Sequence, residues 1–317
     1  MIVADALRMA PAIGSLAMGC EQMGGTDWGR VDLSETRRAV RCALDLGVKV
    51  FDTADVYGLG QSERELGRAL GKDRHSAVIV TKFGIRWRRK PKGERALTFR
   101  DASPNYVTRA LEGSLRRLRV EAIPVYLVHW PDPAVRLEDT LGALEAEREK
   151  GKVVAYGLSN FDVEQIAHAT RSFPVGAVEC PFSLIQHTLG EAICRAVRPA
   201  GLMTLTYGVL GQGLLTGKYQ VRSRFDESDR RSRLPQFADD QWPKYKNLLS
   251  SLKRASIERG KSMAQVAIRW VLDSGLVNCA IIGAKTPEQV EGAVGALGWA
   301  LTQEEWMGLR VAATADG

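Results

Sequence analysis

The fold is decided by the stretch FDTADVYG (residues 51–58), which places an acid and a phenol where an apolar run ends. The run ahead of it, GVKVF (residues 47–51), is short, contains β-branched side chains and is bounded by glycine, which is typical of a buried strand. Two glycines then interrupt the chain before SERE (residues 62–65), a pattern that predicts a capping box at the start of a helix. Asp52 and Tyr57 are therefore expected on the loop that leaves the carboxyl end of a strand.

Strand and helix patterns alternate along most of the chain. Short apolar runs predict seven further strands, at about 16–20, 77–81, 123–128, 153–158, 175–180, 203–207 and 279–282. Amphipathic segments predict helices at about 34–46, 62–70, 104–118, 137–150, 242–259 and 262–274, with short helices before and after residues 175–180. Eight such repeats predict a parallel sheet closed into a (β/α)8 barrel, formed as one domain by residues 1–317. The active site of such a barrel is built where its strands end.

Some segments fall outside this alternation. Residues 86–103 are polar and are predicted to form a long loop, and residues 208–241 lack periodicity, which predicts a functional loop over the barrel mouth. Residues 1–12 are expected to form a short cap over the opposite end. Pro124 cannot donate to a central strand, so it is expected among the first residues of its strand.

The amino-acid composition limits the kinds of protein to which this chain can belong. A chain of 317 residues that is 45% hydrophobic can bury a sizeable core. No apolar run approaches the roughly 18 residues that span a bilayer, and no signal-peptide pattern is evident, so a soluble, cytoplasmic protein is expected. The five cysteines include no Cys-x-x-Cys pair and are expected to be reduced, and the histidines lack metal-binding spacing, so no metal is expected.

The formal charge of +7 comes partly from two basic clusters, at residues 86–92 and 230–233. Both fall in predicted loops, and only one aromatic residue, Trp87, is interleaved with them. We interpret the clusters as solvated loops, or as a source of attraction for a phosphorylated cofactor or an anionic substrate, and we expect neither a nucleic acid nor a membrane as a partner.

Two later motifs follow the opening stretch in order: TKFG (residues 81–84) and LVHWPDP (residues 127–133). Together the three motifs resemble the aldo-keto reductase superfamily, and the similarity runs from about Gly14 to about Val294. The resemblance implies a barrel enzyme that reduces an aldehyde or ketone to an alcohol, or performs the reverse oxidation, with a nicotinamide cofactor. The implied partner is a small carbonyl compound, and the oligomeric state is left open.

Four residues match the catalytic tetrad of that family: Asp52, Tyr57, Lys82 and His129. Tyr57 is the expected proton donor, and since a phenol has a pKa near 10, a cation is needed to bring it closer to working pH. Lys82 can be that cation, held by a charge-assisted hydrogen bond to Asp52, while His129 orients the carbonyl or relays the proton. Each residue alone has a structural explanation, but the ordered set favours catalysis.

The nicotinamide end of the cofactor is expected at Ser159, Asn160 and Glu179, with the ring stacked on Tyr207. Similar proteins hold the carboxamide with a Ser-Asn pair and a glutamine, so Glu179 is a departure from the family. A carboxylate accepts hydrogen bonds but cannot donate one, so Glu179 must be protonated or make one bond fewer. Ala177 is the alternative equivalent of the glutamine, and a core position is the alternative for Tyr207.

The phosphate end is expected at two loops. Residues 208–218 resemble the pyrophosphate loop of the family, and residues 283–289 open a helix. Lys285, beside a helix N-terminus, is the expected partner of a 2′-phosphate, which favours NADPH over NADH. Helix initiation by a capping box from Thr286 to Gln289 is the structural alternative. The candidate residues are Gly208, Leu210, Gly211, Gly213, Lys218, Gly283, Lys285, Thr286 and Gln289.

Substrate specificity is expected to depend on Glu21 and Trp130. The family often has an aromatic residue where this chain has Glu21, and a carboxylate there indicates a polar or sugar-like carbonyl compound, or else a solvated loop acid. The alternative function is an NADPH-binding, redox-sensing regulatory subunit that acts on a protein partner. The intact tetrad and the lack of a long N-terminal extension favour the enzyme.

Overall fold

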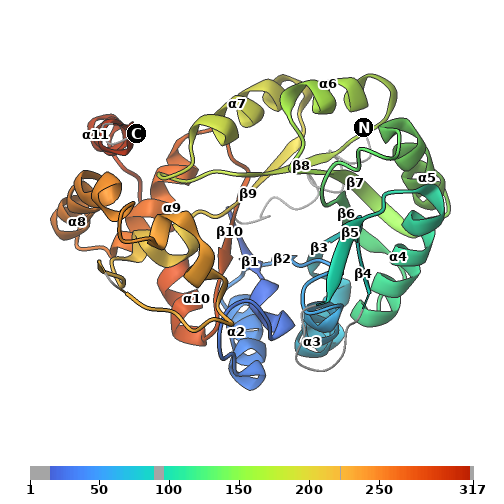
Figure 1. The fold of residues 1–317 in the computed structure, drawn as a ribbon, viewed down its shortest axis with the longest axis horizontal. Coiled ribbons are helices and arrows are strands. Elements are labelled where there is room, and N and C mark those ends of the chain that lie inside the picture. The colour runs from blue at the N-terminus through green and yellow to red at the C-terminus, as the bar shows by residue number, and fades with distance from the viewer. Residues whose placement is uncertain (1–14, 89–95, 222, 315–317) are drawn as a thin grey trace.

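A computed structural model describes residues 15–88, 96–221 and 223–314. Eight parallel strands close into a barrel in the order β1-β10-β9-β8-β7-β6-β3-β2 (Figure 1). Their bounds are β1 Leu16–Gly19, β2 Val50–Asp52, β3 Val78–Phe83, β6 Ile123–Val128, β7 Val153–Ser159, β8 Ala177–Pro181, β9 Met203–Tyr207 and β10 Cys279–Gly283. The predicted (β/α)8 barrel is therefore confirmed, and Pro124 is the second residue of its strand, as expected.

Helices surround the barrel (Figure 1). They are α2 Leu33–Asp45, α3 Gln61–Leu70, α4 Pro104–Leu118, α5 Leu137–Glu149, α6 Val163–Ser172, α7 Thr188–Val197, α8 Lys246–Arg259, α9 Met263–Asp273, α10 Pro287–Val294 and α11 Gln303–Thr314. The sequence did not predict α11. This helix is held by two stacked indoles, Trp270 and Trp306, whose ring centroids are 5.1 Å apart. Each indole N–H donates to the backbone carbonyl of the other residue, at 3.1 and 2.8 Å.

The barrel interior is a separate apolar layer. Side chains alternate along each strand, so Val125 and Leu127 of β6 join the interior cluster, while Tyr126 packs outward against Phe83. The interior cluster consists of Ala17, Val50, Val80, Val125, Leu127, Ala177, Met203, Leu205, Cys279 and Ile281. On six of the eight strands the next position with the same inward phase is polar or aromatic, and on β1 and β10 it is glycine; these positions form the barrel mouth.

The polar stretch after β3 is a hairpin, so the predicted long loop was wrong. Strands β4 Ile85–Arg88 and β5 Leu97–Arg100 pair in antiparallel fashion, and residues 89–95 lie outside the described part of the chain. The hairpin is stabilised by Arg86, whose guanidinium lies over the Phe99 ring and bonds Asp101 at 3.0 Å. Because most of its side chains face solvent, the segment contains many charged residues and lacks the apolar pattern by which strands are predicted.

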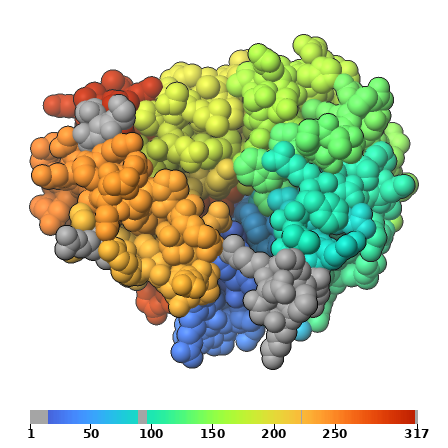
Figure 2. All heavy atoms as spheres, in the orientation of Figure 1, coloured from blue at the N-terminus to red at the C-terminus, as the bar shows by residue number. Residues whose placement is uncertain are grey.

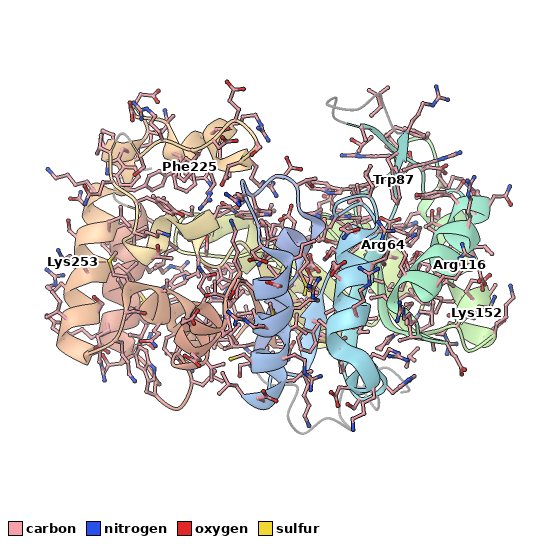
Figure 3. All side chains as sticks on the ribbon, turned by 90° about the horizontal axis from the view of Figure 1, so that it is seen from below. Arg64, Trp87, Arg116, Lys152, Phe225 and Lys253 are labelled. Atoms are coloured by element: carbon pink, nitrogen blue, oxygen red, sulfur yellow. The ribbon has the colours of Figure 1, made fainter. Side chains whose placement is uncertain are left out.

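The hairpin rises on the same side of the barrel as the long loop after β9. Figure 3 shows Trp87 of the hairpin and Phe225 of that loop projecting on this side. From above, Figure 2 shows the surface hollowed between the residues of the two projections. The expectation that residues 208–241 reach over the mouth agrees with this arrangement.

The start of α3 differs from the predicted capping box. Its N-cap is Gly60, at φ 85°, with no side-chain cap hydrogen bond. The Ser62 hydroxyl instead donates to the carbonyl of Cys20 at 2.6 Å, and Glu65 pairs with Arg37 at 2.7 Å and with Arg68 at 2.5 Å. Ser62 is buried against the β1 loop, and its hydroxyl bonds this carbonyl instead of an amide of its own helix.

Four further expectations concern the N-terminal segment, membrane-spanning helices, metal sites and disulfides. The predicted N-terminal cap, residues 1–12, lies outside the described residues. Within the described ranges, no helix is both long and apolar enough to cross a membrane, and no three His, Cys, Asp or Glu side chains are grouped as a metal site. The five cysteines form no disulfide there.

Candidate active site

The inward phase of the strands brings the expected site residues together. Asp52 ends β2, Lys82 is the last inward residue of β3, and His129 follows β6, so three members of the tetrad leave neighbouring strands. On the opposite wall Ser159 pairs in register with Glu179. Ala177 lies one inward step below Glu179, in the apolar interior, so Glu179 and not Ala177 reaches the mouth.

Lys82 is the charge at the centre of the site. Its side chain is fully buried, and its ammonium donates to Asp52 at 2.5 Å and to the carbonyl of Thr53 at 3.1 Å. Burial alone would lower the pKa of Lys82, but Asp52 and Glu179 more than offset it, and the pKa is raised well above its ordinary value. Burial raises the pKa of Asp52, against the attraction of Lys82. Lys82 is therefore a permanent cation at neutral pH.

Tyr57 faces Lys82 and His129 from the loop after β2. The Lys82 ammonium lies 5.6 Å from the centre of the phenol ring, and the imidazole of His129 meets the ring edge-on at a centroid distance of 5.8 Å. Burial raises the pKa of Tyr57 well above 10, and Lys82 lowers it only in part. The expectation that Lys82 brings this pKa toward working pH is thus wrong for the protein alone, because burial outweighs the cation. The phenol carries its proton at neutral pH.

His129 is an uncharged imidazole in this setting. Burial, reinforced by the charge of Lys82, holds the pKa of His129 well below its ordinary value of 6.5. Its backbone amide continues the ladder by donating to the Phe83 carbonyl at 2.8 Å. Its Nδ1 atom is buried and bonds no other group in the described part of the chain. A neutral imidazole both donates and accepts, so it is suited to orienting a carbonyl group.

The Tyr57 loop is fixed by a close backbone crossing. Gly58, at φ 57°, passes so near the β1 loop that an added Cβ would lie 2.1 Å from the carbonyl oxygen of Gly24. Ser62 and Thr53 share a hydrogen bond at 2.8 Å under the same loop. Only glycine fits this crossing, and the phenol position depends on it.

Gly58→Ala tests the crossing, with Gly25→Ala as its matched control. Gly25 has a similar φ of 69° but nothing within 4 Å of an added Cβ, so it carries only the backbone strain. We expect the crowded variant to be about 1 to 3 kcal/mol less stable than the control, the usual range for overpacking. Turnover should fall roughly 10- to 100-fold, because misplaced catalytic groups lose that much. Equal unfolding midpoints and turnover in the two variants would contradict the proposed role of the crossing.

Ser159, Asn160 and Tyr207 form one hydrogen-bonded group. The Tyr207 hydroxyl donates to Asn160 Oδ1 at 2.6 Å, and Asn160 Nδ2 donates to the His129 carbonyl at 2.9 Å and to Ser159 Oγ at 3.0 Å. Asn160 adopts the left-handed φ of 65°, which turns its side chain back toward the strand ends. The amide plane and the Tyr207 ring are thereby fixed relative to His129.

Glu179 completes this wall and reaches across to Lys82. Its Oε2 atom lies 3.2 Å from the Lys82 ammonium, and the Ser159 hydroxyl is 3.4 Å from Oε1, a long hydrogen bond. The side chain is buried, and this burial, followed by the charge of Asp52, raises the pKa of Glu179 to about 8, with Lys82 acting in the opposite sense. The carboxyl group is therefore mainly protonated at neutral pH, one of the two states expected from the sequence.

The glycine-rich loop after β9 contains the 3-10 segment Gly211–Thr216, which is kinked at Gln212 and Gly213. Gly211 and Gly213 both have positive φ, and an added Cβ would lie 2.6 Å from Ile185 or 2.8 Å from Tyr219, so close packing alone requires glycine at both. Their amides are already bonded to the carbonyls of Gly208 and Leu210. Any phosphate contact must use other amides of this loop, or Lys218, which is exposed beyond it.

Lys285 lies in a group of cations beside the long loop. Its ammonium donates to the Trp28 carbonyl at 2.6 Å. Burial, followed by the charges of Arg231 and Lys218, lowers the pKa of Lys285. Arg231 pairs with Asp229 and lies 4.6 Å over the Phe225 ring, and the sequence analysis had not singled it out within its basic cluster. Mutually repelling cations of this kind favour an anionic ligand.

The helix that follows Lys285 begins differently from its predicted capping box. Thr286 is the N-cap residue of α10, but it makes no side-chain hydrogen bond to the backbone, so the box was wrong. Gln289 Oε1 instead accepts from the Lys285 amide at 2.7 Å, one residue earlier. Gly283 lies against Gln22, whose amide donates to the Ala284 carbonyl at 3.0 Å. These bonds set the position of Lys285 beside β1.

Glu21 is bound to the long loop. Its carboxylate accepts from Arg230 at 2.7 Å, although burial raises its pKa. The two residues are 209 positions apart, so no local pattern could reveal this pair. Trp130 is 37% exposed, and the guanidinium of Arg100 lies over its ring at 5.6 Å. The two substrate candidates thus lie on different loops of the mouth, and each is paired with an arginine.

The wall opposite Tyr57 fits a nicotinamide carboxamide. Such a group needs donors for its oxygen and acceptors for its NH₂, and Ser159, Asn160 and Glu179 offer both kinds. The Glu179 carboxyl group is buried, and its Oε2 atom faces the Lys82 ammonium at 3.2 Å. The adjacent Tyr207 ring supplies a flat face. These donors and acceptors beside a flat ring are those expected of a binding site for this ligand.

Comparison with known proteins gives consistent similarities. A family model described as "Aldo/keto reductase family" matches residues 15–312. The aldo-keto reductase YhdN of Bacillus subtilis is 34% identical, covering 92% of this chain and 87% of that protein. The NADP(+) aldo-keto reductase yakc of Schizosaccharomyces pombe is 31% identical, covering 90% and 84%. The structure of a glycerol dehydrogenase from Gluconobacter oxydans is 36% identical, with a TM-score of 0.86 over 94% of this chain and 90% of that one.

Proposed function

Because the chain belongs to the aldo/keto reductase family and is an NAD(P)H-dependent oxidoreductase, we propose that it interconverts a hydroxylated aldehyde or ketone and its alcohol with NADPH as the reductant. The observation that carries this proposal is the contact of Tyr57, His129, Lys82 and Asp52 at the barrel mouth. The reduced nicotinamide, when bound, supplies the hydride that reaches the carbonyl carbon.

Tyr57 is the proton donor in this proposal. As the C=O π bond breaks and the new C–H bond forms, negative charge develops on oxygen, and the Tyr57 hydroxyl transfers its proton there. Its raised pKa keeps the phenol protonated at neutral pH. Lys82 stabilises the phenolate that results, because an opposite charge nearby favours the ionised form. The phenolate then regains a proton from solvent, and the reverse sequence oxidises the alcohol.

His129 positions the carbonyl oxygen. Its neutral imidazole offers a donor without adding a second cation beside Lys82. Its orientation is supported by the Asn160 bond to its backbone and by the edge-on contact with Tyr57. A positioned hydrogen-bond donor of this kind stabilises developing oxygen charge in a site from which water is excluded.

The residues that the sequence analysis predicted to bind the cofactor are proposed to hold the dinucleotide. Ser159, Asn160 and Glu179 hold the carboxamide and Tyr207 stacks on the ring. The loop of residues 208–218 accepts the pyrophosphate. Lys285, with Arg231 added to the earlier set, holds the 2′-phosphate. The name of the fission yeast relative, which includes NADP(+), supports this preference.

A hydroxylated substrate is supported by the polar mouth and by the similarity to a glycerol dehydrogenase. Glu21 and Arg230 lie on loops that close over the strand ends, where substrate identity is set in barrels. A site that hydrogen-bonds hydroxyl groups leaves its polar groups unpaired with an apolar substrate, so it discriminates strongly. Kinetics on a panel of short hydroxylated aldehydes and matched unsubstituted aldehydes tests this class. A higher kcat/KM for the unsubstituted compounds would contradict it.

Lys285→Ala is expected to separate the two coenzymes. Loss of a charged hydrogen bond should weaken NADPH binding by about 1 to 3 kcal/mol and leave NADH nearly unaffected. Dissociation constants for both coenzymes, measured by quenching of tryptophan fluorescence, check this result. Lys253→Ala, a change at an exposed position of α8 on the outer edge of the molecule (Figure 3), serves as the control. Equal losses for NADPH and NADH would show instead that the start of α10 is damaged.

A further inference from the structure

Two carboxyl groups share one ammonium at the base of the site. Lys82 Nζ is 2.5 Å from Asp52 and 3.2 Å from Glu179, and all three side chains are buried. If both acids were ionised, the group would carry a net charge of −1 in a region shielded from water. Such a charge is costly, so one proton is retained when the site is empty of a compensating cation.

The proton belongs mainly to Glu179. Asp52 has the shorter contact with the ammonium, at 2.5 Å, whereas Glu179 Oε2 is 3.2 Å away, so the ammonium stabilises the Asp52 carboxylate more strongly. Burial and the charge of Asp52 raise the pKa of Glu179 to about 8. A positive charge brought to this wall would release the proton, because an opposite charge favours the carboxylate.

The other titratable groups around Glu179 do not gain or release a proton near neutral pH. Cys180 follows it on β8 and Tyr207 lies across on β9, and burial contributes to raising the pKa of both. Tyr57 faces it from the β2 loop with a pKa raised by burial. All three remain uncharged near neutral pH, so Asp52 and Lys82 are the fixed charges that act on Glu179.

We propose that Glu179 sets the relative affinity of the site for the oxidised and reduced dinucleotide. The inference rests on the proposed function, which places the nicotinamide at Ser159, Asn160 and Glu179. The oxidised ring is positively charged and the reduced ring is neutral, so an ionised Glu179 attracts only the oxidised form. A glutamine, the residue of similar proteins, has no charge and lacks this preference.

Cofactor binding is therefore coupled to the release of a proton from Glu179. Binding of the oxidised form releases the Glu179 proton at neutral pH, and by linkage its affinity rises with pH. The reduced form gains nothing from ionisation. The preference for the oxidised form therefore strengthens as the pH rises toward and through about 8, the pKa of Glu179. Alkaline conditions then favour loading for alcohol oxidation.

Dissociation constants of NADP⁺ and NADPH, measured by fluorescence quenching from about pH 6 to pH 9, test the proposal. The two forms carry the same phosphates, so the ratio of their constants removes the titration of those groups. In the wild type, affinity for NADP⁺ relative to NADPH should rise about 10-fold or more across this range, since one linked proton allows up to about 10-fold per pH unit. Glu179→Gln should change the ratio by less than about two-fold.

Glu147→Gln is the matched control, because Glu147 is also a buried glutamate but lies on α5 with Lys150 as its partner. It should retain the wild-type pH dependence. Calorimetry of NADP⁺ binding in two buffers of different ionisation enthalpy gives a second readout, in which the wild type releases a proton near pH 7.5 and Glu179→Gln does not.

Two results would overturn the proposal: a flat ratio in the wild type, or the same slope in Glu179→Gln. Failure of the protein to bind either dinucleotide would instead defeat the proposed function, and the inference with it. Titration of the Glu179 carboxyl carbon by NMR in the protein alone separates these cases. A midpoint near the ordinary value for glutamate would contradict the retained proton whether or not a dinucleotide binds.

Discussion

Tyr57→Phe is expected to remove nearly all turnover while NADPH binding stays unchanged. The hydroxyl proton is needed only as charge develops on the carbonyl oxygen, and the phenol ring itself is buried by contacts that phenylalanine preserves. A general acid typically contributes about 10²- to 10⁴-fold, and we expect a loss of kcat within this range. Stopped-flow measurement of the hydride-transfer step, together with fluorescence titration of NADPH, separates chemistry from binding.

Tyr156→Phe is the control for that variant. Tyr156 is a buried tyrosine of β7 that packs in the outer layer between strands and helices, away from the mouth. Loss of the Tyr156 hydroxyl should leave turnover near that of the wild type. Retention of more than half of wild-type turnover in Tyr57→Phe would remove Tyr57 from the role of proton donor.

Lys82→Met is the second variant with a large expected effect. Removal of the ammonium leaves Asp52 and Glu179 facing each other without a cation. Breaking a buried ion pair on one side typically costs about 3 to 5 kcal/mol of the free energy of unfolding. Turnover should also fall by about 10²- to 10³-fold, because the phenolate of Tyr57 loses its stabilising charge. Denaturant unfolding and steady-state kinetics measure the two losses.

The double variant Lys82→Met, Asp52→Asn distinguishes charge from packing. Replacing Asp52 removes the buried charge that has lost its ammonium partner, so about 1 kcal/mol or more of stability should return, within the range of coupling seen between contacting residues. Turnover should not return, because the cation is still missing. Additive losses of stability in the double variant would show that Lys82 acts by filling space alone.

The barrel and its tetrad could be predicted because their signals are local. Six of the eight strands carry a polar or aromatic inward residue directly after an apolar run, and three motifs place Asp52, Lys82 and His129 at the ends of strands that prove to be neighbours. The inward phase also places Glu179 and not Ala177 at the mouth, but only when the strand bounds are known. Site residues at the ends of regular strands can therefore be predicted from the sequence.

The missed features depend on partners distant in sequence. Arg230 bonds Glu21 from the long loop, and Ser62 bonds Cys20 in place of its own helix. The paired strands at residues 85–88 and 97–100 have a polar, largely exposed surface, which resembles that of a loop. The pKa of Tyr57 is raised because residues from several loops of the barrel mouth bury the phenol. Considering only the charge of Lys82, as the sequence allows, could not predict this effect.

The central claim is best tested by the stoichiometry of NADPH oxidation with excess glyceraldehyde, a short hydroxylated aldehyde, under continuous absorbance measurement. An enzyme of the proposed kind consumes many equivalents of NADPH per protein at a constant rate and forms an equal amount of alcohol. Consumption that stops after one equivalent, with the oxidised dinucleotide retained, would contradict the account and identify the redox-sensing regulatory subunit instead.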